Sequence, residues 1–140
     1  MATEVRSFSQ RPSRLVITKH FDFEAAHRLP FHNGKCKRPH GHSYHLAVSL
    51  IGDIQEDTDA NVASGMVLDF GEVSSSVKAI IGESLDHYDL NITVHDNPTA
   101  ERILAWIVEK LYDVFGVMLY EVTLWETKTA SVTWKKHLHG

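Results

Sequence analysis

The chain has 140 residues, of which 43% are hydrophobic, and a formal net charge of −4 with neutral histidines. This length suits a single domain with a sizeable core, and the acidic balance argues against a general nucleic-acid-binding protein, whose surface is usually basic. No apolar run reaches the roughly 18–20 residues that cross a bilayer, and the first residues lack the apolar region of a signal peptide. The single cysteine, Cys36, cannot form an internal disulfide, so we expect a reducing cytoplasm as the compartment.

Two alternating segments follow a predicted flexible tail at residues 1–14. Apart from Lys19 and Gly52, apolar or histidine side chains occupy every second position of residues 15–27 and of residues 40–52, which predicts two strands, each with one mostly buried face. The intervening segment 28–39 is rich in proline and glycine, and we expect a loop there. After an acidic turn, the apolar run MVLDF predicts a short strand at residues 66–70.

The second half of the chain is predicted to contain two helices and two more strands. Apolar residues recur at helical spacing in residues 70–85 and again within residues 97–116, with an irregular connection between them. Residues 119–127 and 131–135 then predict strands. Because strands and helices are segregated along the chain, we expect an α+β domain at residues 15–140, with an antiparallel sheet covered on one face by helices.

Three histidines are candidate metal ligands. His40 and His42 are two residues apart in a predicted strand, so their imidazoles point to the same side. His27 ends the preceding strand and lies on that side too, opposite the pair, if the two strands are neighbours. Three imidazoles with a fourth position left for water or substrate are typical of catalytic zinc sites. A histidine pair of this spacing, taken alone, is as often a pair of surface residues without a function as a metal site. His20 and His45 fall on the opposite faces of their strands and are therefore left out.

Other polar residues are candidates for proton transfer and ligand binding. Cys36 lies in a polar loop between two lysines, whose positive charges stabilise a thiolate. A thiolate at this position is a candidate base, nucleophile or fourth metal ligand, and the sequence leaves these three roles open. Asp86 precedes His87, and an aspartate can orient an imidazole, although such neighbours also occur by chance. Glu126 lies on an otherwise apolar strand face and needs a partner. That partner is either a strand-end salt bridge or a planar ligand with a guanidine-like edge.

Taken in order, these segments resemble one family, the 6-pyruvoyl-tetrahydropterin synthase and 6-carboxy-tetrahydropterin synthase group. FEAAHRL resembles the segment with the first zinc ligand, CKRPHGHSY matches the family's C-x3-HGH signature, and GMVLDFGEV, LDHYDLN, NPTAE and WET match its later motifs. The resemblance runs from about Leu15 to Trp134. It implies a tunnelling fold, in which a four-stranded antiparallel sheet has two helices on one face. Three such subunits close a β-barrel and two trimers stack into a homohexamer, with active sites between subunits.

The resemblance also implies a substrate, 7,8-dihydroneopterin triphosphate, and a role for each candidate residue. The implied roles are zinc binding by His27, His40 and His42, proton transfer by Cys36 as the base with Asp86 and His87, and pterin binding by Glu126 with Thr127. The residues that would hold the triphosphate are left open among Lys19, Arg28, Lys35, Lys37 and Arg38.

Two subfamilies differ in their product. The pyruvoyl synthases keep the three-carbon side chain as a diketone. The carboxy-synthases cut it, release acetaldehyde and leave a carboxylate on the pterin, in 7-deazaguanine and queuosine biosynthesis. The short gap between Cys36 and His40 resembles the carboxy-synthases, which we therefore favour, with the pyruvoyl synthase as the alternative. A non-catalytic zinc-binding module is a further alternative, and it would need neither an activated thiolate nor a carboxylate for a pterin.

Overall fold

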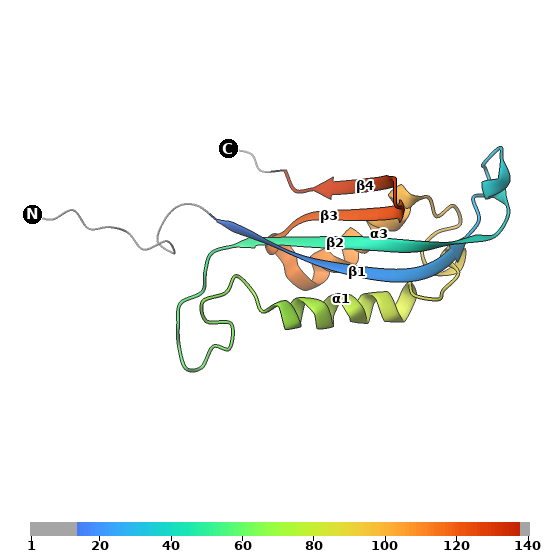
Figure 1. Cartoon of the computed structure of the whole chain (residues 1–140). Helices are drawn as coiled ribbons and strands as arrows, with labels where there is room; N and C mark the ends of the chain where they lie inside the picture. The colour runs from blue at the N-terminus through green and yellow to red at the C-terminus, as the bar shows by residue number, and fades with distance from the viewer. Residues whose placement is uncertain (1–13, 138–140) are drawn as a thin grey trace, which may run out of the picture.

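The computed structural model describes residues 14–137, which contain one four-stranded antiparallel sheet with strand order β1-β2-β3-β4. The strands are β1 (Leu15–His27), β2 (His40–Gly52), β3 (Leu119–Thr127) and β4 (Ala130–Lys135). The two long helices, α1 (Phe70–Ser84) and α3 (Ala100–Phe115), lie on one side of the sheet, and the short helix α2 (Leu90–Thr93) lies near the end of β1 (Figure 1). The predicted α+β class, with helices on one face of an antiparallel sheet, is confirmed.

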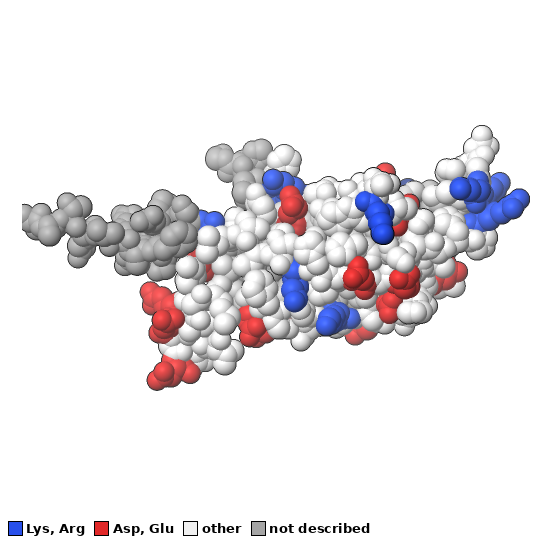
Figure 2. All heavy atoms as spheres, in the orientation of Figure 1, with Lys and Arg blue, Asp and Glu red and all other residues white. Residues whose placement is uncertain are grey.

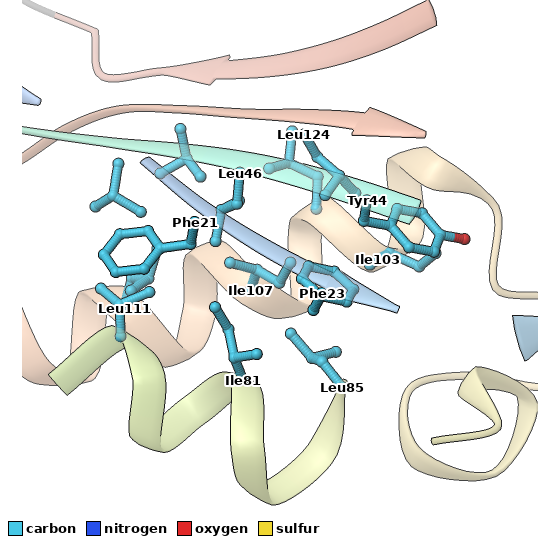
Figure 3. Close-up of a cluster of buried hydrophobic side chains, with 14 of the residues drawn as sticks. Phe21, Phe23, Tyr44, Leu46, Ile81, Leu85, Ile103, Ile107, Leu111 and Leu124 are labelled. Atoms are coloured by element: carbon cyan, nitrogen blue, oxygen red, sulfur yellow. The ribbon is translucent and has the colours of Figure 1, made fainter. Parts of the chain in front are cut away.

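The core lies between the sheet and the two long helices. The period-two alternation of the strands directs their apolar side chains to one face, and the helices contribute a stripe that packs against it. Figure 3 shows this cluster, with Phe21, Phe23, Tyr44, Leu46 and Leu124 from the strands and Ile81, Leu85, Ile103, Ile107 and Leu111 from or next to the helices. Burial of this apolar face against the helices is the main force that holds the sheet in its orientation.

The pairing of β1 with β2 runs without interruption from Leu15, opposite Gly52, to His27, opposite His40. Ala25 lies opposite His42 in the same register. The two strands are therefore neighbours, as the sequence interpretation required, and all three histidines lie on the face that packs against the helices.

The short strand predicted at residues 66–70 is wrong. Phe70 is already the first residue of α1, and the Asp69 carboxylate accepts a hydrogen bond of 2.8 Å from the Gly71 backbone N–H as the helix cap. Residues 66–68 form bends instead, where Met66 and Val67 accept hydrogen bonds from the backbone and side chain of Gln55. Backbone carbonyls of this apolar run are thus hydrogen-bonded to Gln55 in the preceding loop, and the run does not join the sheet.

The face of the sheet away from the helices includes small polar side chains that pair across strands. Hydroxyl pairs join neighbouring strands at Thr18–Ser49, 2.7 Å apart, and at Thr123–Thr133, 2.8 Å apart. Within residues 14–137, no strand pairs with the outer edge of β4. The sheet therefore has one buried face, one polar face and an unpaired edge.

The predicted tail at residues 1–14 lies outside the described residues except for Arg14, and so do residues 138–140 at the end of the predicted domain. Arg14 donates a hydrogen bond of 3.4 Å to the Ile51 carbonyl and lies 4.0 Å from the Asp53 carboxylate. The division into tail and domain therefore stays a prediction. Among the helices of residues 14–137, none combines the length and the apolar character that a membrane span requires.

Candidate metal centre

Three histidines converge where β1 ends and β2 begins. One ring nitrogen from each of His27, His40 and His42 lies within 4.8 Å of the other two. The His27 ring is 4.6 Å from that of His40 and 5.1 Å from that of His42 between centroids, and His27 is only 2% exposed. No other group of three potential metal-binding side chains with this spacing occurs within residues 14–137. The predicted convergence is confirmed.

Backbone carbonyls orient two of these imidazoles. His27 Nδ1 lies 2.8 Å from the Pro98 carbonyl, and His40 Nδ1 lies 2.8 Å from the Arg38 carbonyl. Because a carbonyl can only accept, each Nδ1 carries the hydrogen and leaves the Nε2 lone pair free for a metal. Sequence reasoning missed the role of Pro98, since a backbone carbonyl contributes without any demand on residue type.

The chemistry of the cluster fits a zinc ion. Nε2 of His27 and Nε2 of His42 are both buried without a hydrogen-bond partner, which is costly unless another group satisfies them. Burial lowers the pKa of both His27 and His42, while the negative charge of Glu126 acts in the opposite direction. Neutral imidazoles with free lone pairs are the form that binds a metal. The three histidines are therefore suited to hold zinc through their Nε2 atoms.

Glu126 faces the same cluster. Its Oε2 lies 3.8 Å from His27 Nε2 and its Oε1 lies 3.9 Å from His42 Nε2, both too far for hydrogen bonds. The pairing of β3 with β4 shifts register between Trp125 and Thr127, and such bulges re-aim side chains next to functional sites. The carboxylate that the sequence left without a partner thus supplies negative charge beside the proposed cation.

The Asp86–His87 pair is held against the free edge of β1. His87 Nδ1 lies 3.0 Å from Asp86 Oδ2, and the Glu24 backbone N–H donates a bond of 2.9 Å to Asp86 Oδ1. That N–H first, and then His87, holds the pKa of Asp86 below its usual range. The His87 N–H in turn donates to the Glu24 carbonyl. The two neighbours in sequence therefore interact, as predicted, but it is Glu24 that fixes their positions.

His87 has an unusual backbone conformation. Its φ of 64° lies in the left-handed region, and it is the one non-glycine residue of the described chain with a positive φ. Strained backbone of this kind clusters at functional sites. The His87 side chain is 78% exposed, and with His42 it lines a cavity of about 430 Å³. The structure thus brings His87 and one zinc-ligand candidate to the same cavity.

Cys36 lies away from the histidine cluster in the described chain. It is half-buried in the turn Lys35–Lys37, on the loop that projects beyond the sheet in Figure 1, and the potential metal-binding group does not include it. Its backbone carbonyl accepts a hydrogen bond of 2.8 Å from the Leu29 N–H. Thr127 is exposed and lines a separate cavity of about 250 Å³ beside Trp125.

The candidate triphosphate ligands do not lie together. Figure 2 shows blue side chains gathered on the projecting loop, below its tip; this loop carries Lys35, Lys37 and Arg38, all exposed. Lys19 lies on β1 eight positions before His27, roughly 26 Å away at about 3.3 Å per residue. Within one chain, the candidate cations are therefore divided between the loop and β1.

His20 and His45 lie on the opposite face of the sheet from the metal-ligand candidates, as predicted. His45 Nε2 is 2.8 Å from His20 Nδ1, and His45 Nδ1 is 2.6 Å from the Asp22 carboxylate. Each of these contacts stays on the face away from the helices, so neither imidazole reaches the metal centre.

Comparisons with known proteins identify the family to which this chain belongs. The family model described as 6-pyruvoyl tetrahydropterin synthase matches residues 16–137. The chain belongs to this family. It is 40% identical over 117 residues to the 6-carboxy-5,6,7,8-tetrahydropterin synthase of Synechocystis sp., covering 83% of this chain and 89% of that one. It is 34% identical over 106 residues to the dihydroneopterin monophosphate aldolase of Pyrococcus furiosus, covering 74% and 82%.

A solved structure supports the same assignment. The 6-pyruvoyl tetrahydropterin synthase of Caenorhabditis elegans superposes with a TM-score of 0.74 at 27% identity, covering 89% of this chain and 97% of that one. The resemblance read from the motifs is therefore confirmed, and it extends over nearly the whole described domain.

Replacing His40 or His42 with alanine should remove most of the bound metal, because only two imidazoles would remain. His45→Ala, on the same strand but the opposite face, is the matched control and should keep the wild-type metal content. Metal per chain can be measured by atomic emission on dialysed protein. Full zinc occupancy in His40→Ala or His42→Ala would refute the assignment of these ligands.

Proposed function

We propose that this chain is a zinc-dependent lyase that converts 7,8-dihydroneopterin triphosphate and water to 6-carboxy-5,6,7,8-tetrahydropterin, acetaldehyde and triphosphate. The observation that carries the proposal is the cluster of three histidines, two of which, His27 and His42, have buried Nε2 atoms without a hydrogen-bond partner, in a chain that is 40% identical to a 6-carboxy-tetrahydropterin synthase. The short Cys36-to-His40 gap favours this product over the pyruvoyl alternative. A non-catalytic zinc module would leave the strained, exposed His87 without a purpose.

In this mechanism the three histidines would form the metal site. His27, His40 and His42 would hold zinc, which polarises oxygen atoms of the substrate side chain and makes the neighbouring C–H and O–H protons easier to remove. The buried position of His27 and its hydrogen bond to Pro98 keep the cluster rigid. Preorganised ligands of this kind keep a catalytic metal in a defined position.

Proton transfer is assigned to two groups of the chain. Cys36, as a thiolate, takes a proton from a carbon of the substrate side chain. His87 exchanges a second proton on the other side through Nε2, while Asp86 fixes its Nδ1 and stabilises the protonated ring. Loss of triphosphate follows, and cutting of the side chain releases acetaldehyde.

Glu126 is proposed to hold the pterin ring. Its two oxygens accept hydrogen bonds from the 2-amino group and the adjacent ring N–H, with help from Thr127 at the end of β3. The nearness of the carboxylate to His27 and His42 supports this role, because a ring held there would direct its side chain toward the metal.

A homohexamer is proposed as the working assembly. Within residues 14–137, the outer edge of β4 has no partner strand, and neither does the edge of the first half of β1 that faces away from β2. Pairing these two edges between copies would remove both. Three sheets joined in this way would close a barrel lined by the polar face, and two trimers would stack. The sites would then lie between subunits, so that Cys36 and His87 of one chain serve different sites. A cytoplasmic location and a place in 7-deazaguanine biosynthesis stay predictions.

Product analysis tests the proposed function directly. Purified zinc-loaded protein is incubated with 7,8-dihydroneopterin triphosphate, and the pterins, acetaldehyde and triphosphate are quantified by chromatography and mass spectrometry. We expect the carboxypterin with one acetaldehyde per triphosphate released. A pyruvoyl product without acetaldehyde would establish the alternative, and absence of any conversion would favour the non-catalytic module.

Cys36→Ala and Cys36→Ser should lose nearly all turnover while they keep zinc and still bind pterin. The reason is that neither variant offers an accessible anion at position 36, whereas the histidine cluster does not include the thiol. Turnover, metal content and pterin affinity are measured on the same preparation. Loss of metal together with activity would make Cys36 a fourth ligand instead, and near-normal turnover would remove it from the mechanism.

Glu126→Gln should weaken pterin binding. Glutamine keeps the shape but turns one acceptor oxygen into a donor, which opposes a donor on the pterin edge. A hydrogen bond to a charged group contributes roughly 1.5–3 kcal/mol, so affinity should fall about ten- to a hundredfold. Glu121→Gln, on the same strand, is the matched control. Unchanged affinity by calorimetry in Glu126→Gln would mean that another residue anchors the ring.

Mixing two inactive variants should restore activity if sites form between subunits. Cys36→Ala and His87→Ala chains are refolded or expressed together, so that some subunit interfaces combine an intact Cys36 from one chain with an intact His87 from another. Random pairing in a symmetric oligomer would rebuild up to about a quarter of the sites. Each variant alone is the control. Mixed oligomers that stay inactive, or a fully active monomer, would contradict the proposed assembly.

A further inference from the structure

The side-chain amide of Asn91 makes three hydrogen bonds to backbone groups outside its own helix. Its Oδ1 accepts from the Arg28 N–H at 2.8 Å, and its Nδ2 donates to the Arg28 carbonyl at 2.9 Å and to the Asp96 carbonyl at 3.0 Å. An amide that engages both backbone groups of one residue takes the place that a neighbouring strand would have. Asn91 thus extends the edge of β1 one residue past its end.

This contact is the last of a series along that edge. The edge presents the backbone of Glu24, which holds Asp86 and His87, and then of Ala26, whose N–H donates a bond of 3.2 Å to the Tyr88 carbonyl. Ala26 also forms an isolated parallel bridge with Asp89. Residues 86–91 therefore follow the strand from Glu24 to Arg28, and Asn91 ends the series with a side chain instead of a peptide group.

The residue that Asn91 holds is linked to the cysteine turn. Leu29 follows Arg28, and its N–H donates the bond of 2.8 Å to the Cys36 carbonyl. The metal-ligand candidate His27 precedes Arg28. One side chain consequently connects the segment that carries Asp86 and His87 to the beginning and end of the loop that carries Cys36.

Asn91 does not use its side chain to stabilise its own helix. The first turn of α2 is capped by Asp89, whose carboxylate accepts the Asn91 backbone N–H at 3.0 Å. The Asn91 amide is therefore available for Arg28 and Asp96, and its chemistry is specific to that task. An aspartate could accept from the Arg28 N–H but would oppose two carbonyl oxygens, and a leucine would fill the space with no hydrogen bond.

We propose that Asn91 is a positioning residue that holds the Cys36 turn and the segment carrying Asp86 and His87 against the end of β1. It touches neither substrate nor metal and acts through Arg28 and Leu29. The catalytic consequence rests on the proposed function, in which Cys36 and His87 move protons. The positioning of the Cys36 turn does not rest on the proposed function, because the hydrogen bonds of Asn91 are present whichever reaction the protein performs.

The test compares Asn91→Ala and Asn91→Asp with Ile92→Ala, a control on the same short helix at a side chain that is 82% exposed. Cys36 is the single cysteine of the chain, so its rate of labelling by a thiol reagent reports on the turn alone. Bound zinc, thermal unfolding, kcat and KM are measured on the same preparations. Labelling does not depend on which reaction the enzyme performs.

We expect Asn91→Ala to label about tenfold faster and to lose roughly tenfold or more in kcat, since all three hydrogen bonds of the amide are removed. KM should stay within about twofold, because the proposed pterin anchor is unchanged, and the metal content should equal that of the wild type. Asn91→Asp should behave similarly, and Ile92→Ala should match the wild type in every measurement.

Wild-type labelling and kcat in Asn91→Ala would overturn the proposal. So would a loss of zinc and thermal stability in step with the loss of kcat, because that is the result of a merely structural role. Should Asn91→Ala fail to fold, the same comparison on Asn91→Asp decides. Faster labelling in a protein whose wild type forms no carboxypterin would keep the positioning role and reject the proposed function.

Discussion

The antiparallel register between β1 and β2 is the constraint on which the rest of the site depends. Because side chains alternate across a strand, the pairing of His27 with His40 puts both on the helix-facing side, and His42 follows two residues later. The register is in turn specified by the apolar residues that precede His27 on β1 and follow His42 on β2, because these residues must face the helices. The packing of the core thus determines where three imidazoles meet, with no separate element devoted to the metal.

The opposite edge of β1 organises the remaining groups. From Glu24 to His27 the strand pairs with β2 on one side, and residues 86–91 follow its other side as far as Arg28. One segment therefore aligns the metal cluster, the Asp86–His87 pair and the root of the Cys36 loop. The left-handed backbone of His87 is tolerated here because Glu24 bonds to that peptide and to the neighbouring carboxylate.

Local pattern was enough to predict the strands and the metal cluster, because alternation and histidine spacing act over a few residues. It failed at residues 66–70, where an apolar run reads as a strand but Gln55 and the Asp69 cap decide the outcome. The contributions of Pro98 and Glu24 could not be predicted, since they are made by backbone groups that lie 71 and 62 residues from their partners. The sequence showed Asn91 only as the last residue of the LDHYDLN motif and indicated no role for its side chain. The location of Cys36 relative to the histidines is a property of an assembled loop, and no spacing rule specifies it.

The uninterrupted β1–β2 register has a consequence for how such a chain can diverge. An insertion or deletion of one residue inside Leu15–His27 would turn every later side chain to the other face of the sheet, sending His27 to the polar side and the apolar residues with it. The same change in the loop between His27 and His40 leaves both strands in register and alters only the reach of the tip. Length variation that survives selection should therefore concentrate in that loop, where it can change which substrate atoms are within reach while the metal-binding residues stay fixed.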